Sequence, residues 1–265
     1  MRAGKVLQGG PQEDLMSDDS PFAAPEDSEF NRAEFEFGDR EPVALDPITI
    51  LQRAFDLVLE QPAPIILSLF IIIGASLVFS VPQEILNFIA ENNDVSEGTI
   101  IALSLGSAGL GIMNYFVSVF FQLGSARLYA DIASGNQATL GLLFSQAHRY
   151  LAGLAATFLL SVVVAVGLCL LIVPGIIAAL GLQFAPYLIV HQGLGPIEAL
   201  QKSWELTDGH KVTLFLVALI IGLLALVLAC VTCGIGYLAA LPVLSLTQAI
   251  MYHSLYCMHR DLNAL

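Results

Sequence analysis

Two long stretches without a single charged side chain constrain this chain more than any other feature. Residues 150–190 carry no charge over 41 positions, and residues 212–256 carry none over 45. A bilayer core about 30 Å thick is crossed by roughly 20 helical residues, so each stretch is long enough for two spans. Charged residues make up only 12% of the chain, whereas soluble domains carry about 25%. The chain is therefore expected to be solvated by a membrane.

Two shorter charge-free tracts, residues 62–81 and 99–124, supply one further span each. Val173-Pro174-Gly175 and Cys233-Gly234-Ile235-Gly236 are suited to turn the two longer stretches into hairpins. The sequence therefore predicts an all-α polytopic transmembrane helix bundle with six spans. The predicted spans are residues 64–81, 100–123, 151–172, 175–191, 212–232 and 236–257.

The basic residues all fall on one side of this predicted topology. The loop at residues 82–98 holds four acidic and no basic side chains, and the two tight hairpins hold no charge. All ten Lys and Arg residues lie in the other loops and the two ends. Cytoplasmic loops of membrane proteins carry the excess of Lys and Arg. We therefore expect a multi-pass protein of a bacterial inner (cell) membrane with both termini in the cytoplasm.

The formal net charge of −13 comes mostly from the N-terminal segment, because residues 1–46 hold 12 acidic and only 4 basic side chains. Such a composition is typical of disorder. We predict a disordered acidic cytoplasmic tail over residues 1–45, a membrane domain over 46–258 and a short cytoplasmic C-terminus over 259–265. Membrane lipids and a protein partner docked on the tail are the expected partners, and no nucleic acid is expected.

Each cytoplasmic segment that precedes a hairpin has the pattern of a short amphipathic helix. Asp46-Pro47 offers an N-cap and a first-turn proline, and similar apolar spacings begin at Thr139 and at Gly195-Pro196. One interpretation is three units, each an interfacial helix and a two-span hairpin, over residues 46–124, 139–191 and 196–257. The alternative is that any helical cytoplasmic loop would show this amphipathic pattern. The apolar positions are Ile48, Leu51 and Phe55; Leu140, Leu143 and Ala147; and Ile197, Leu200 and Trp204.

Pro174-Gly175, residues 184–190 (FAPYLIV) and residues 195–210 (GPIEALQKSWELTDGH) form a continuous pattern. It resembles the bacterial superfamily that includes the glycerophosphoryl diester phosphodiesterase membrane domain, over roughly residues 45–258. The resemblance implies a six-span architecture. In that family the catalysis belongs to a separate soluble barrel with a His-Arg pair and acidic metal ligands. His148-Arg149 lacks the Glu-x-Asp partner, so we interpret it as an interfacial anchor.

No catalytic constellation, cofactor motif or metal box is recognisable, and the chain is not expected to be an enzyme. The CxxC at Cys230 and Cys233, with Cys169, could form a disulfide on an oxidising outer face, but small residues of this kind also pack helices. The amides inside the predicted spans could line a polar pathway, or could hydrogen-bond between helices. These amides are Asn114, Gln122, Gln183 and Gln248, and the expected interfacial anchors are Arg53, Arg127, Arg149, Lys202, Trp204 and Lys211.

Three functions fit this sequence. The first is a non-catalytic scaffold, accessory or lipid-interacting protein of the membrane. The second is a transporter or lipid translocator, which requires that the four amides converge on one cavity. The third is an enzyme acting on lipid head groups, which requires His and acidic groups within about 10 Å of one reacting centre. The groups available for it are His148, His191, Glu205, Asp208 and His210.

Overall fold

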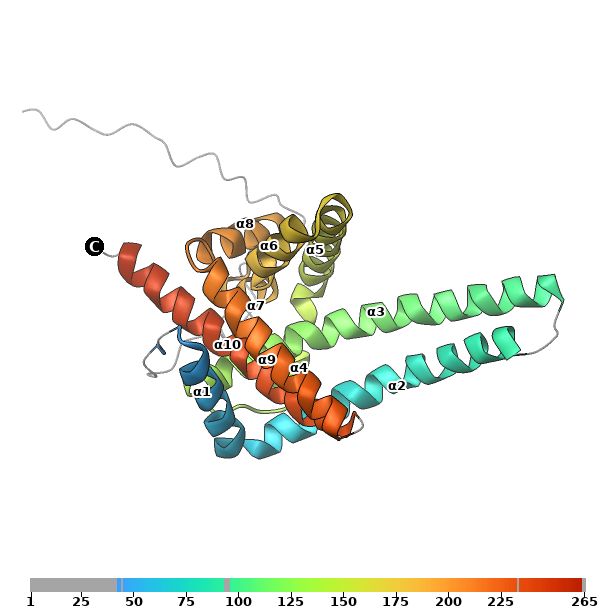
Figure 1. The fold of residues 1–265 in the computed structure, drawn as a ribbon, viewed down its shortest axis with the longest axis horizontal. Helices are drawn as coiled ribbons and strands as arrows, with labels where there is room; N and C mark the ends of the chain where they lie inside the picture. The colour runs from blue at the N-terminus through green and yellow to red at the C-terminus, as the bar shows by residue number, and fades with distance from the viewer. Residues whose placement is uncertain (1–41, 44, 93–95, 233, 264–265) are drawn as a thin grey trace, which may run out of the picture.

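The computed structural model describes residues 42–43, 45–92, 96–232 and 234–263. Within these residues every regular element is helical and none is a strand, which confirms the predicted all-α fold (Figure 1). The elements are α1 (Pro47–Glu60), α2 (Pro62–Asn92), α3 (Glu97–Ser134), α4 (Leu142–Ser145), the 3-10 helix η2 (Ala147–Arg149), α5 (Tyr150–Leu170), α6 (Ile172–Leu182), α7 (Ala185–Gln192), α8 (Pro196–Leu206), α9 (Lys211–Val231) and α10 (Ile235–Asn263).

Among the described residues, six helical segments are long and apolar enough to cross a membrane. They are α2, α3, the continuous run from α4 to α5, the run from α6 to α7, α9 and α10. The predicted six-span membrane bundle is therefore confirmed at the level of helix length and composition.

The first two spans are much longer than predicted. The sequence places a loop at residues 82–98, but α2 continues to Asn92 and α3 already begins at Glu97. A drop in hydrophobicity marks the point where a helix leaves apolar surroundings, but the helix itself can continue. Glu and Gln, which occur in residues 82–92, are good helix formers in water. The two helices run side by side as an arm that projects from the remaining bundle (Figure 1).

The hairpin between α5 and α6 turns slightly earlier than predicted. Leu171 alone interrupts the helices in an extended conformation, whereas the sequence suggested residues 173–175. Pro174 is accommodated in the first turn of α6, where its missing N–H costs nothing. Gly167 and Gly175 lie against each other, and a Cβ on Gly167 would stand 2.9 Å from the Gly175 Cα. These glycines let the two helices approach closely. The second predicted turn is in place, with Gly234 in the left-handed region at φ 91°.

The core of the bundle is formed by the second helix of each hairpin. The later half of α3, all of α7 except its end, and the later half of α10 are largely buried, whereas α5 and α9 expose large apolar side chains. Exposed apolar surface of this extent is expected where lipid is the solvent. The central helices contribute buried Leu123, Leu128 and Ile132; Leu188 and Ile189; and Leu246 and Ile250.

The helices α1 and α8 occupy two of the three positions where interfacial helices are predicted. Asp46 caps α1 by accepting a hydrogen bond from the Thr49 N–H at 3.2 Å. The α1 helix buries Ile50 and Leu57 while Ile48 stays exposed on the opposite side. This leaves an apolar side chain free to contact lipid, and the placement of α1 and α8 at a membrane surface stays a prediction.

The third predicted interfacial helix, starting at Thr139, does not form. That segment contains only the four-residue α4 and the three-residue η2, and its Leu143 is fully buried. Its backbone lies directly on α3 at Gly124, where a Cβ would overlap the Leu143 carbonyl. The segment therefore packs against α3, because the missing side chain of Gly124 leaves room for the Leu143 backbone.

Both ends of the membrane domain extend beyond the predicted boundaries. The Val43 N–H donates to the Ser254 Oγ at 3.1 Å, so part of the predicted tail packs on α10. Helix α10 continues to Asn263, into the segment 259–265 predicted as a short cytoplasmic C-terminus. The remainder of the predicted tail, residues 1–41 and 44, lies outside the described residues.

Candidate functional site

Three of the four predicted intramembrane amides line one cavity of about 250 Å³. Gln122 comes from α3, Gln183 from the junction of α6 and α7, and Gln248 from α10. Asn114 does not contribute to this cavity, although it lies on the same helix as Gln122. The other lining residues carry no charge; they are Ala156, Thr157, Leu160 and Val164 of α5, Ala179 of α6, and Ala185 and Pro186 of α7.

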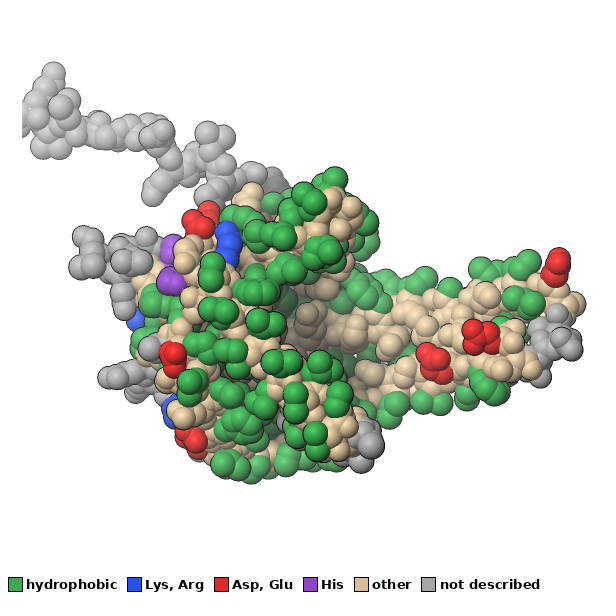
Figure 2. Space-filling model, in the orientation of Figure 1, with side chains coloured by type: hydrophobic (Ala, Val, Ile, Leu, Met, Phe, Trp, Pro, Cys, Tyr) green, Lys and Arg blue, Asp and Glu red, His purple; other side chains and the backbone are tan. Residues whose placement is uncertain are grey.

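The cavity opens at the surface of the bundle. Gln122 and Gln248 are exposed, whereas Gln183 is only partly exposed. Figure 2 shows the molecule hollowed beside the base of the α2–α3 arm, between α5–α6 and α9–α10. The surrounding surface is apolar on this face (Figure 2). In a membrane the opening would therefore face the bilayer.

The amides of this cavity are incompletely satisfied by the protein. Gln122 Oε1 accepts a long hydrogen bond of 3.5 Å from the Thr157 hydroxyl. Gln183 Nε2 is shielded from solvent and has no hydrogen-bond partner in the protein. A buried donor without a partner costs about 1–3 kcal/mol. The cavity therefore offers hydrogen-bonding capacity that the fold does not use.

Gln183 owes its position to a break in the fourth span. Helix α6 ends at Leu182 and α7 begins at Ala185, and residues 183–184 between them form a turn in which Gln183 keeps helical backbone angles (φ −62°, ψ −22°). Pro186 stands in the first turn of α7, where it favours a helix start. Irregular backbone at membrane depth is tolerated only where it is buried in protein or lines a cavity. The break satisfies both conditions.

The backbone groups freed by the break are satisfied by α8. The Ser203 hydroxyl donates to the Gly181 carbonyl at 2.8 Å and accepts from the Phe184 N–H at 3.2 Å. The Thr207 hydroxyl lies 3.3 Å from the same Gly181 carbonyl. Gly181 also has to be glycine, because a Cβ there would overlap the Trp204 ring. We refer to Gly181, Phe184, Ser203, Trp204 and Thr207 as the α8 clamp.

On the α10 side, α7 is locked by an aromatic cluster. The rings of Tyr187 and Tyr252 stack with centroids 5.2 Å apart. His191 Nδ1 lies 2.6 Å from the Tyr252 hydroxyl, and Gln192 Nε2 donates to the Tyr256 hydroxyl at 3.2 Å. These contacts leave the α7 half of the broken span firmly held, so the cavity has one rigid wall.

The groups needed for a lipid-modifying enzyme have separate partners. His191 pairs with Tyr252, His148 Nδ1 lies 3.2 Å from the Ser145 carbonyl, and Asp208 pairs with Lys211 at 3.3 Å. In the part of the chain that the structure describes, no group of three or more His, Cys, Asp or Glu is placed to hold a metal ion. Of the cysteines, Cys169 and Cys230 are exposed thiols, and Cys233 lies outside the described residues.

The predicted interfacial anchors divide into two kinds. Arg127 and Arg149 work inside the fold: Arg127 pairs with Asp131 at 3.1 Å, with both side chains nearly buried, and Arg149 donates to the carbonyls of Ile189 and Val190 at the end of α7. The others remain nearer the surface. Lys211 Nζ stands 3.8 Å from the centre of the Trp204 ring, Arg53 lies 3.8 Å from Glu60, and Lys202 is partly exposed on α8.

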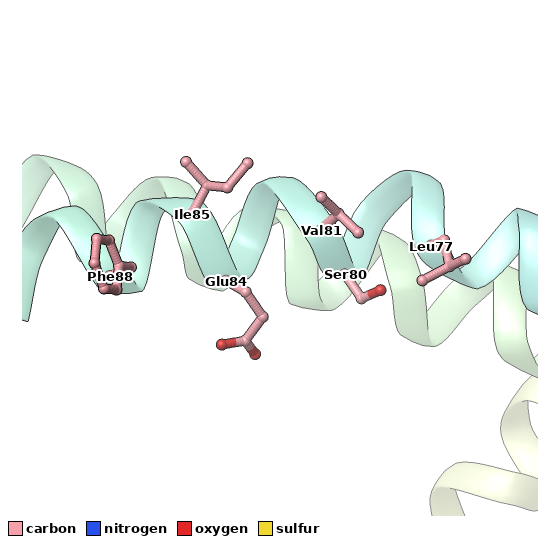
Figure 3. A pocket seen from close by; sticks show the side chains of 6 residues that line it. All are labelled: Leu77, Ser80, Val81, Glu84, Ile85 and Phe88. Atoms are coloured by element: carbon pink, nitrogen blue, oxygen red, sulfur yellow. The ribbon is translucent and has the colours of Figure 1, made fainter. Parts of the chain in front are cut away.

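A second hollow of about 480 Å³ lies on the arm and is lined by α2 alone. Figure 3 shows its side chains fanning outward from one helix without converging on a common point. It is an apolar helix face and offers no set of polar groups to a ligand. Its residues are Leu77, Ser80, Val81, Glu84, Ile85 and Phe88.

Residues 133–258 match a family described as a domain of unknown function, DUF7847. The matched part contains α4 to α10 with the α8 clamp and most of the cavity, and leaves out the α2–α3 arm and Gln122. No curated protein and no solved structure matches the chain. The match does not link the chain to the glycerophosphoryl diester phosphodiesterase membrane-domain superfamily, so that resemblance stays a prediction.

Proposed function

We propose that this chain is a lipid-binding protein of the membrane that holds the polar part of a lipid in the cavity between α3, α5, α6–α7 and α10. The observation that carries the proposal is the convergence of Gln122, Gln183 and Gln248 from three separate parts of the chain on one opening. Gln183 Nε2 and Asn114 Oδ1 are both buried without a partner in the protein, but only Gln183 faces a cavity in which a ligand could supply one.

The depth of the cavity supports a lipid ligand. Gln183 lies 8 residues from either end of the predicted span 175–191, and Gln248 lies 9 residues before the end of the predicted span 236–257. At a rise of about 1.5 Å per residue, these positions are roughly 12 and 14 Å from the corresponding span ends. Polar groups at such a depth are costly beside hydrocarbon. A ligand with oxygen atoms at this level and an apolar remainder would satisfy them.

The proposal includes the predicted membrane and orientation. We place the chain in a bacterial inner membrane with both termini in the cytoplasm, because all ten Lys and Arg residues occur in the segments assigned to that side. On the face shown in Figure 2, the arm carries acidic but no basic side chains, whereas blue Lys and Arg side chains lie at the other end of the bundle. The superfamily resemblance, with its implied six-span architecture, agrees with this arrangement.

Native mass spectrometry of the full chain, purified in mild detergent with its own lipids, tests this function. We expect a discrete one-to-one lipid adduct on the unmodified protein, weakened in Gln183→Leu. The matched control is Asn114→Leu, which removes an amide from a span but not from the cavity, and should keep the adduct. A bare protein, or a diffuse lipid distribution that is identical in all three, would contradict the proposal and favour a scaffold role.

A further inference from the structure

We infer that the cavity recognises the ester carbonyls of a diacyl lipid and not its head group. This inference rests on the proposed lipid-binding function and specifies the chemical class of the ligand. It follows from what lines the cavity, from which hydrogen-bonding groups are unused, and from the size of the space.

The lining of the cavity is polar but uncharged. Its polar side chains are three glutamines and one threonine. Neither Arg127 nor Arg149 lines the cavity: Arg127 pairs with Asp131, and Arg149 donates to the carbonyls of Ile189 and Val190. A phosphate placed among neutral amides in a low-dielectric site would lack a compensating cation, which strongly disfavours it. The ligand group that enters the cavity is therefore neutral.

Among the side chains that line the cavity, the buried atom without a partner is a donor. Gln183 Nε2 has no acceptor in the protein, and Gln122 Oε1 already accepts from the Thr157 hydroxyl. A ligand oxygen that accepts a hydrogen bond from Gln183 Nε2 would therefore satisfy this donor. In a diacyl lipid, the neutral acceptors that lie below the head group are the ester carbonyls of the glycerol backbone.

The remaining lining and the volume fit the same part of the lipid. Leu160, Val164 and Ala179 give the cavity an apolar side that can contact the first carbons of an acyl chain. Its volume of about 250 Å³ is too small for a whole lipid, since pockets for complete small ligands measure about 300–1,000 Å³. The ester region would enter the cavity, while the chains and head group remain in the bilayer.

The test compares lipids that differ in one feature at a time. The delipidated full chain is titrated, in native mass spectrometry, with diester phosphatidylglycerol, diether phosphatidylglycerol of the same chain length, and diester phosphatidylcholine. The two diester lipids should bind within about twofold of each other, and the diether lipid about threefold to tenfold more weakly, as expected for one lost hydrogen bond. Gln183→Leu should remove the preference for ester over ether, and Asn114→Leu should retain it.

The possible outcomes separate this inference from the function it rests on. Binding that follows head-group charge and ignores the ester linkage would overturn the inference, and sensitivity to Gln183→Leu in that case would leave the proposed function standing. Binding of all three lipids that is unchanged by Gln183→Leu would overturn both. An ester preference that persists unchanged in Gln183→Leu would place the carbonyl contact elsewhere and also overturn the inference.

Discussion

Replacing Ser203 by alanine is the sharpest perturbation of the α8 clamp. The Ser203 hydroxyl is fully buried and is the bridge between the two sides of the helix break, donating to Gly181 and accepting from Phe184. Alanine fits the same space but can neither donate nor accept. The change therefore removes two hydrogen bonds without adding bulk.

The expected cost follows from what each backbone group loses. The Gly181 carbonyl keeps only the Thr207 hydroxyl at 3.3 Å, and that hydroxyl also lies 3.0 Å from the Trp204 carbonyl and 3.1 Å from the Ser203 carbonyl. The Phe184 N–H belongs to a fully buried residue and loses the partner that Ser203 provides. Leaving such a donor unpaired costs about 1–3 kcal/mol, so Ser203→Ala should lower the free energy of unfolding by about 2 kcal/mol.

Reversible unfolding in mixed detergent micelles, followed by far-UV circular dichroism, measures this free energy. The control is Ser161→Ala, whose exposed hydroxyl bonds only to the Thr157 carbonyl in its own helix, and it should stay within about 0.5 kcal/mol of the unmodified protein. Because Ser203 and Thr207 share one acceptor, Thr207→Val should couple to Ser203→Ala by at least about 0.5 kcal/mol. If Ser203→Ala and Ser161→Ala were equally stable, the Ser203 hydrogen bonds would not stabilise the turn between α6 and α7, and the reasoning would be refuted.

Three further predictions test the packing and the topology. Gly124→Val should destabilise the bundle by about 1–3 kcal/mol, because the added atoms would overlap the segment that follows α3, while Gly74→Val, in open space, should be close to neutral in the same unfolding assay. Asp131→Asn should lower the free energy of unfolding by about 3–5 kcal/mol, because the nearly buried Arg127 charge would lose its carboxylate. Asp208→Asn, in a pair whose carboxylate is exposed, should lower it by less than about 1 kcal/mol. Equal losses of stability in the two variants would contradict this reasoning. In spheroplasts that carry the chain with its four native cysteines replaced by serine, a membrane-impermeant maleimide should label Asn92→Cys and spare Asp208→Cys, and the reverse pattern would overturn the orientation.

The sequence was sufficient to predict the helical class and the number of spans, because both follow from hydrophobicity over windows of about 20 residues. It misplaced helix ends wherever the apolar tract and the helix have different lengths, as in α2. It also assigned an interfacial helix after Thr139, since the apolar spacing there resembles the other two. This segment packs inward because its backbone at Leu143 contacts Gly124 of α3. Such a contact between two elements cannot be predicted from the local sequence pattern.

The candidate site was partly visible in the sequence. Gln122, Gln183 and Gln248 could be selected as rare polar residues in apolar spans, but their convergence, and the exclusion of Asn114, depend on how the helices rotate against one another. Thr157 was missed because a threonine in a membrane helix usually bonds to its own backbone. Ser203 and Thr207 did carry a signal: Ser203 in α8 and Thr207 at its C-cap are four residues apart, which puts both hydroxyls on the buried side of the helix.

A cryo-EM structure of the full chain in a lipid nanodisc, with a bound antibody fragment to aid alignment, would test the lipid-binding cavity most directly. We predict density in the cavity that contacts the amide of Gln183 and continues past Leu160 into the bilayer as an acyl chain. An intact break between α6 and α7 whose cavity is filled by protein side chains, with Gln183 paired to another helix, would contradict the account.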